Sequence, residues 1–213
     1  MKLNHLLRKG IAEAMGVMIF VTSIVAMNNS GFHNLALATT LALMILVTAT
    51  VSGGHLNPAV TLFFFARKSI DLTTLAVYWV SQLIGATLGL YLGYALSQTP
   101  VSAQAGVTGY ETGAIIGEVL ATTVLILIII RLATTKREAI IPFAVGLWVF
   151  AASTFTLTGA QANPAVTFAL MVRDGFTQNH LMIVLAEFIG ALVALIYITL
   201  LDGNIKAKKK KKK

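Results

Sequence analysis

Two seven-residue stretches of this chain match each other: His55-Leu56-Asn57-Pro58-Ala59-Val60-Thr61 and Gln161-Ala162-Asn163-Pro164-Ala165-Val166-Thr167. Each contains the tripeptide Asn-Pro-Ala, follows an apolar run and opens a second, shorter one. At average residue usage, a chain of this length contains about 0.03 copies of such a tripeptide. Two copies in equivalent settings therefore indicate an internal repeat.

The composition around this repeat is that of a membrane protein. Of the 213 residues, 57% are apolar and 11% are charged, whereas soluble domains carry about 25% charged residues. Six apolar stretches approach the ~20 residues that cross a bilayer as a helix. They are residues 11–27, 35–51, 75–96, 112–132, 140–155 and 180–201. The sequence therefore predicts an all-α membrane protein with six transmembrane helices.

Two further apolar segments, residues 57–66 and 163–171, are too short to span a bilayer. Gly53-Gly54 and Gly159 interrupt the chain before them. Because non-helical backbone inside a bilayer must be buried in protein or line water, we expect residues 52–56 and 158–162 to re-enter the membrane. Each loop would then start a half-helix near the membrane centre.

The two halves of the chain also align outside the matched stretches. Glu13 corresponds to Glu118, and Gln82 corresponds to Glu187, at a spacing of 105 residues. Each half contains three spans, an odd number, so the halves enter the membrane from opposite sides. An inverted 3+3 repeat of this kind places functional sites near the midplane on broken helices. We expect one domain over residues 1–205, with repeats at about 10–96 and 112–201.

Basic residues predict the orientation of these spans. All but one precede the first span or follow the second, fourth or sixth: Lys2, Arg8, Lys9, Arg67, Lys68, Arg131, Lys136, Arg137 and Lys206 with its neighbours. The exception, Arg173 in the last external loop, is next to Asp174 in the sequence. The loops at 28–34 and 97–111 contain none. Because Lys and Arg favour the cytoplasmic side, both termini are expected in the cytoplasm, with the protein in a plasma or inner membrane.

The net charge of +8 is dominated by one end of the chain. Seven of the 16 basic residues lie in the lysine-rich tail, residues 206–213, so the charge does not indicate a nucleic-acid partner. The tail is expected to be disordered, as a native or an engineered segment, with binding to anionic lipid as the alternative. The chain has no Cys, which excludes disulfides and thiolate metal sites. No metal or cofactor is expected.

The Asn-Pro pairs suit the start of the two half-helices. Asn is a preferred N-cap, and proline at the first helical position loses no hydrogen bond. The amide NH2 groups of Asn57 and Asn163 would remain to donate into a pore, where two positive helix ends disfavour cations. The expected pore-lining carbonyls are those of Gly53, Gly54, His55, Leu56, Gly159, Ala160, Gln161 and Ala162.

These residues carry a family resemblance. The stretch 52–61 resembles the first pore loop of aquaporins, the major intrinsic protein family, and Glu13, Glu118, Gln82 and Gly85-Ala86 fit the family pattern. The resemblance implies a pore in each subunit of a homotetramer in the lipid bilayer. It also implies a passive channel rather than an enzyme, for water and small uncharged solutes such as glycerol, urea, ammonia and hydrogen peroxide.

One position departs from that pattern. The family usually has Arg after the second Asn-Pro-Ala, and this chain has Val166. Family spacing puts the other constriction positions at Leu37, Ala151 and Ala160. The resemblance with these substitutions implies a wider, apolar and uncharged constriction, in which proton exclusion depends more heavily on Asn57 and Asn163.

Alternatives remain for the roles of the intramembrane acids and for the class of function. We expect Glu13 and Glu118 to brace the re-entrant loop of their own half, whereas Glu187 does something similar or faces a subunit interface. An ion-coupled secondary transporter also uses inverted repeats and broken helices, and would show saturable, gradient-dependent flux. A scaffold or junction protein with a residual pore would be indifferent to bulkier residues at Asn57 and Asn163.

Overall fold

The chain folds into a bundle of helices in a computed structural model that describes residues 4–26, 31–97 and 111–210. The elements are α1 (His5–Ala26), α2 (His33–Ser52), α3 (Pro58–Ala66), α4 (Leu72–Ser97), α5 (Thr112–Thr134), η1 (Glu138–Ile140), α6 (Ile141–Phe155), α7 (Pro164–Asp174) and α8 (Gln178–Lys210). Among the described residues, six segments are long and apolar enough to cross a membrane: α1, α2, α4, α5, η1 with α6, and α8 as far as Leu201. The six predicted spans are confirmed, although the first begins at His5 rather than at residue 11.

The helix contacts repeat between the two halves. The most extensive are those of α1 with α4 and of α5 with α8, and the contact of α1 with α2 has its counterpart in α5 with α6. The remaining major contact, α2 with α6, joins equivalent helices of the two halves. Exchanging the halves therefore leaves the contact pattern unchanged, which is the inverted 3+3 repeat that the sequence predicts.

The short helices α3 and α7 connect the halves. Each packs against the last helix of its own half, and each also packs against the last helix of the other half, α3 against α8 and α7 against α4. The two short helices also contact each other. The site at their N-termini is thus built from both repeats, and neither half forms it alone.

Small residues allow the long helices to approach closely. A Cβ atom on Gly85 of α4 would clash with the backbone of Ala14 in α1, and a Cβ on Gly190 of α8 would lie 2.7 Å from the carbonyl oxygen of Val119 in α5. Such small-residue contacts are typical of membrane helix pairs, because no hydrophobic effect drives helices together in lipid. The two equivalent crossings set the spacing of the bundle.

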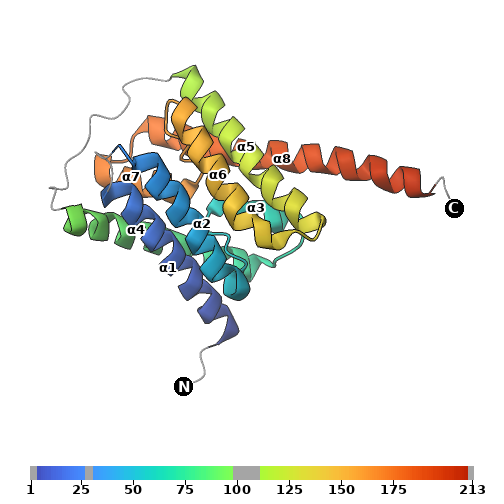
Figure 1. The fold of residues 1–213 in the computed structure, drawn as a ribbon, viewed down its shortest axis with the longest axis horizontal. Helices are drawn as coiled ribbons and strands as arrows, with labels where there is room; N and C mark the ends of the chain where they lie inside the picture. The colour runs from blue at the N-terminus through green and yellow to red at the C-terminus, as the bar shows by residue number, and fades with distance from the viewer. Residues whose placement is uncertain (1–3, 27–30, 98–110, 211–213) are drawn as a thin grey trace.

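The C-terminal end differs from the sequence expectation. Helix α8 continues to Lys210, and its last turns project beyond the rest of the bundle (Figure 1). The sequence predicts a disordered lysine-rich tail from residue 206. The last three lysines of that tail, residues 211–213, lie outside the described residues, as do residues 28–30 and 98–110 of the two basic-free loops.

Candidate functional site: the paired asparagine caps

Each half-helix begins with an asparagine that caps its backbone. Asn57 has extended backbone, and its side-chain Oδ1 accepts hydrogen bonds from the N–H groups of Ala59 at 2.8 Å and Val60 at 3.3 Å. Asn163 has the same geometry, with Oδ1 accepting from Ala165 N–H at 3.0 Å. Proline follows each asparagine at a position where the helix needs no N–H. Local sequence therefore fixes where α3 and α7 begin.

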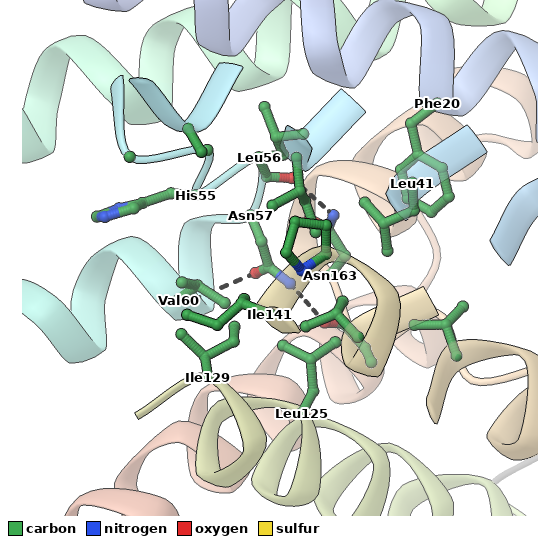
Figure 2. Close-up of a pocket in the computed structure, with 18 of the residues that line it drawn as sticks. Phe20, Leu41, His55, Leu56, Asn57, Val60, Leu125, Ile129, Ile141 and Asn163 are labelled. Atoms are coloured by element: carbon green, nitrogen blue, oxygen red, sulfur yellow. Dashed lines mark hydrogen bonds between the residues drawn. The ribbon is translucent and has the colours of Figure 1, made fainter. Parts of the chain in front are cut away.

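The two asparagine amides bond across the repeat (Figure 2). Asn57 Nδ2 donates to the carbonyl oxygen of Ala162 at 2.7 Å, and Asn163 Nδ2 donates to the carbonyl oxygen of Leu56 at 2.9 Å. Each asparagine thus binds the residue that precedes the other one, and the N-termini of α3 and α7 are tied together. Since an amide nitrogen carries two hydrogens, each side chain keeps a second N–H.

The two loops before these caps follow the same backbone path. Positive φ angles occur at three equivalent positions in each loop: Gly53, Gly54 and Leu56, and Gly159, Ala160 and Ala162. A left-handed conformation costs a residue with a Cβ about 1–2 kcal/mol, so Leu56, Ala160 and Ala162 are strained. Strain of this kind persists only where surrounding contacts hold it.

Glu13 of α1 supplies those contacts in the first half. Its side chain is fully buried, and its carboxylate accepts from four donors: Ser52 Oγ at 2.5 Å, His55 N–H at 3.0 Å, Leu56 N–H at 2.6 Å and Gln82 Nε2 at 2.7 Å. Hydrogen bonds to a charged acceptor are roughly twice as strong as neutral ones. This carboxylate therefore holds the strained loop ahead of Asn57.

Glu118 of α5 occupies the equivalent place in the second half. It is fully buried and accepts from the Thr158 hydroxyl, from Gln161 N–H at 2.9 Å and from Ala162 N–H at 2.7 Å. Its three donors match three of the four that surround Glu13, position for position. Two acids from the two halves thus hold two loops in one geometry.

A further pair of polar residues lies behind the caps. Gln82 Nε2 on α4 donates to Thr61 Oγ1 at 3.1 Å, and its counterpart Glu187 on α8 has Oε1 2.9 Å from Thr167 Oγ1. Glu187 Oε1 also accepts from the backbone N–H of Asn163 at 2.9 Å. Sequence reasoning left the place of Glu187 open, and it did not single out the threonines. The sequence did contain a sign of their role, because Thr61 and Thr167 are the last residues of the two matching seven-residue stretches.

A cavity of about 320 Å³ reaches the two asparagines (Figure 2). Its polar wall consists of the loops ahead of the caps: Gly53, Gly54, His55, Leu56, Gln161 and Ala162. Much of the remaining wall is apolar: Phe20, Leu41, Ile45, Val60, Leu125, Ile129, Val145 and Val149. The residues that line it also include Ala133 and Glu138, from the end of the molecule where α5 meets η1. Gly159 and Ala160 do not line this cavity.

The four expected constriction residues do not all lie together. Leu37, Ala160 and Val166 are buried in the apolar core and do not line this cavity, whereas Ala151 on α6 is exposed. Val149 of the same helix lines the cavity, and a residue two positions further along a helix points to nearly the opposite side. Ala151 therefore faces away from the cavity. The fully buried residue next to it is Ala152, so counting by family spacing missed the inward face of α6.

In the described part of the chain, six spans in two inverted halves, joined through paired asparagine caps beside a cavity, define a multi-span membrane protein of the inverted-repeat class. A family model for the major intrinsic proteins matches residues 1–205, and the chain belongs to this family, whose members are channels rather than enzymes.

Curated relatives and a solved structure agree with that assignment. The chain is 31% identical over 206 residues to a probable aquaporin, PIP2-8, of Arabidopsis thaliana, covering 88% of this chain and 66% of the relative. It is 35% identical over 190 residues to a probable aquaporin, TIP1-2, of Oryza sativa subsp. japonica, covering 82% and 74%. The chain thus spans only about two thirds of the first relative's length. The X-ray structure of an aquaglyceroporin from Plasmodium falciparum matches its fold with a TM-score of 0.75 at 24% identity, covering 90% of this chain and 95% of that one.

Proposed function

We propose that this chain is a passive channel for water and small uncharged solutes, with ions and protons excluded at Asn57 and Asn163. The observation that carries the proposal is the exchanged pair of hydrogen bonds between the two caps, at 2.7 and 2.9 Å. It fixes both amides beside the cavity, and each keeps one N–H for a solute oxygen. A water molecule that accepts from both amides cannot at the same time relay a proton along a continuous chain of waters.

Helix electrostatics support the exclusion of cations. The N-termini of α3 and α7 meet at the caps, and each carries about +0.5 elementary charge. Glu13 and Glu118, the buried acids next to the two loops, accept hydrogen bonds from the backbone N–H groups of those loops. Their carboxylates are therefore engaged by the protein and not by a passing cation. A cation at the caps meets two positive helix ends, whereas a neutral solute does not.

Val166, at the position where the family usually has arginine, supports the passage of several kinds of solute. Val166 is buried in the apolar core together with Leu37 and Ala160, so the proposed constriction has neither the bulk nor the charge of an arginine. We infer that glycerol, urea, ammonia and hydrogen peroxide pass in addition to water. The Plasmodium falciparum neighbour is by title an aquaglyceroporin, which is a property of that protein and only compatible with this proposal.

The test uses purified protein in liposomes, with water and glycerol permeability measured by stopped-flow light scattering. Substantial flux of both solutes is expected. Fast water flux without glycerol flux would contradict the wide constriction, and flux of neither would contradict the channel proposal. Saturable flux that depends on a proton gradient would instead favour a secondary transporter.

Assembly and orientation complete the proposal. We infer a homotetramer with both termini in the cytoplasm, from the family resemblance and from the basic loops. The long helices carry exposed apolar side chains, among them Leu43, Leu88, Leu120 and Leu147, which fit contact with lipid or with other copies. Native mass spectrometry from detergent should show four copies, and a monomer as the only species would contradict that assembly.

A further inference from the structure

Glu187 is a buried acid with unusual surroundings. Its side chain is fully buried on α8. Oε1 accepts the N–H of Asn163, while Oε2 has no hydrogen-bond partner in the part of the chain that the structure describes. Its counterpart in the first half, Gln82, is also fully buried and likewise has one oxygen, Oε1, without a partner. A carboxylic acid in one half thus occupies the place of a neutral carboxamide in the other.

The hydrogens around Thr167 place a proton on this acid. Thr167 Oγ1 lies 2.6 Å from Gln161 Oε1 and 2.9 Å from Glu187 Oε1. A hydroxyl group has only one hydrogen to donate. The 2.6 Å contact suits an O–H···O bond and is shorter than N–H···O bonds usually are, so Gln161 presents its oxygen and takes that hydrogen. The contact between Thr167 and Glu187 then needs a hydrogen from Glu187.

The first half shows a related arrangement in which the donor to the threonine is known. There Gln82 Nε2 donates to Thr61 Oγ1 at 3.1 Å, and the Thr61 hydroxyl lies 2.9 Å from the carbonyl oxygen of Asn57 and 3.3 Å from His55 Nδ1. A protonated Glu187 reproduces the donation to the threonine: Oε1–H donates to Thr167, while the same oxygen accepts the N–H of Asn163. The carbonyl oxygen Oε2 stays without a partner among the described residues, as Gln82 Oε1 does. The two halves then match in charge as well as in geometry.

The neighbouring acid argues for the same assignment. Glu118 and Glu187 accept from consecutive backbone N–H groups, those of Ala162 and Asn163. Two ionised carboxylates in one buried site repel each other, so one of them takes a proton. Glu118 has three donors that stabilise its charge. Glu187 has one backbone donor and an oxygen without a partner, which makes it the costlier of the two to ionise.

We propose that Glu187 is protonated in the folded protein and acts as a neutral positioning residue, which holds Asn163 through its backbone N–H and Thr167 through its hydroxyl. Neutrality matters because an ionised carboxylate at this place would oppose the positive N-terminus of α7. That consequence rests on the proposed channel function, under which the helix end helps to exclude cations. The protonation itself does not depend on whether the protein conducts anything.

The test is infrared difference spectroscopy on the purified full chain, which detects the carbonyl stretch of a protonated carboxylic acid. Wild type minus Glu187→Gln should show such a band, shifted by deuterium exchange. Gln82→Glu is the matched control, since it builds the same acid pair in the first half and should add a second band. A folded wild type without the band would overturn the proposal. A folded Gln82→Glu variant without a second band would show that an acid at this position need not donate a hydrogen to the threonine, and would remove the argument for a protonated Glu187.

Flux measurements add a readout that separates neutrality from a merely structural role. Both contacts of Glu187 are made by Oε1, so in Glu187→Gln the amide nitrogen can donate to Thr167, as Gln82 donates to Thr61, but it cannot accept from Asn163. The variant thus removes the ionisable group together with one hydrogen bond, and its potassium leak should stay equal to that of wild type. A potassium leak in wild type above that of protein-free vesicles, which is lost in Glu187→Gln, would show that a negative charge had been removed, and would overturn the proposal. If the infrared band is present but the protein passes no water, Glu187 is protonated and the proposed channel function is wrong.

Discussion

Asn57 and Asn163 each make two kinds of hydrogen bond, one with the oxygen and one with the nitrogen of the same side-chain amide. The oxygen caps the helix that the residue begins, and the nitrogen binds the loop of the other half. Aspartate caps a helix equally well, but it has no N–H to give to the opposite loop. The amide is therefore required by the link between the halves, while the cap alone would tolerate several residue types.

The backbone at Ala160 carries strain that its counterpart avoids. Ala160 has φ +52°, where the first half has Gly54 at +61°. Because the left-handed conformation costs about 1–2 kcal/mol for a residue with a Cβ and glycine loses about 0.5–1 kcal/mol in entropy, Ala160→Gly should stabilise the fold by about 0.5–1 kcal/mol. Thermal unfolding in detergent measures this. Ala165→Gly, inside α7, should instead destabilise, and the same sign for both would refute the strain.

Val166 should set the ratio of glycerol to water flux. Arginine at this position adds bulk and charge to the proposed constriction, so Val166→Arg is expected to lower glycerol permeability several-fold more than water permeability. Val166→Leu adds some bulk without charge and should lower the ratio less. Stopped-flow measurements of both solutes give the ratio directly. An unchanged ratio in the arginine variant would place the narrowest part of the pore elsewhere.

At the level of elements, each half-helix is held by the long helices of its own repeat. Helix α1 holds the loop ahead of α3 through Glu13, α5 holds the loop ahead of α7 through Glu118, and α8 reaches the cap of α7 through Glu187. Since these acids are fully buried, each gains its hydrogen bonds without competition from solvent. The half-helices are positioned by polar contacts within an otherwise apolar bundle.

Removing one of these acids should cost stability before it alters selectivity. Glu118→Ala leaves the N–H groups of Gln161 and Ala162 without acceptors, and an unsatisfied buried donor costs about 1–3 kcal/mol. We expect a clear fall in the thermal unfolding temperature. Glu111→Ala is a suitable control, because Glu111 is exposed and makes no side-chain cap bond. Equal stability of the two variants would show that Glu118 does not hold the loop.

The crossing of α1 and α4 should tolerate no side chain at its closest point. A Cβ on Gly85 would clash with the backbone of Ala14, and forcing extra atoms into a packed core costs about 1–3 kcal/mol. Gly85→Ala should therefore destabilise the protein or prevent its insertion. A Cβ on Gly31 would meet no atom within 4 Å, so Gly31→Ala serves as the control. A fully stable Gly85→Ala variant would mean that the helices can separate without loss.

For the whole molecule, the sequence predicts the architecture well because its constraints are global. Span length, the odd number of spans in each half and the repeated Asn-Pro-Ala motif together require an inverted repeat with two half-helices. The contact pattern confirms this arrangement. The pairing of Glu13 with Glu118 could be proposed for the same reason, since symmetry relates residues that lie 105 positions apart.

Other features depend on details that neither spacing nor composition specifies. The exchange of hydrogen bonds between Asn57 and Asn163 requires the exact approach of two loops, and the sequence predicts only that their amides are free. Ala151 shows the limit of spacing arguments: a shift of one residue on α6 separates an exposed alanine from a fully buried one. Glu187 could not be placed because its role depends on which helix packs behind the second cap.

The central claim is that the paired caps pass neutral solutes and exclude cations. The most direct test measures osmotic water flux and passive proton leak in the same proteoliposomes, for wild type and for Asn163→Asp, which keeps a cap but replaces the amide donor with a carboxyl group. Wild type should show water flux well above protein-free vesicles with a proton leak equal to theirs, and the aspartate variant should leak protons. A proton leak in wild type that rises with its water flux would contradict the account.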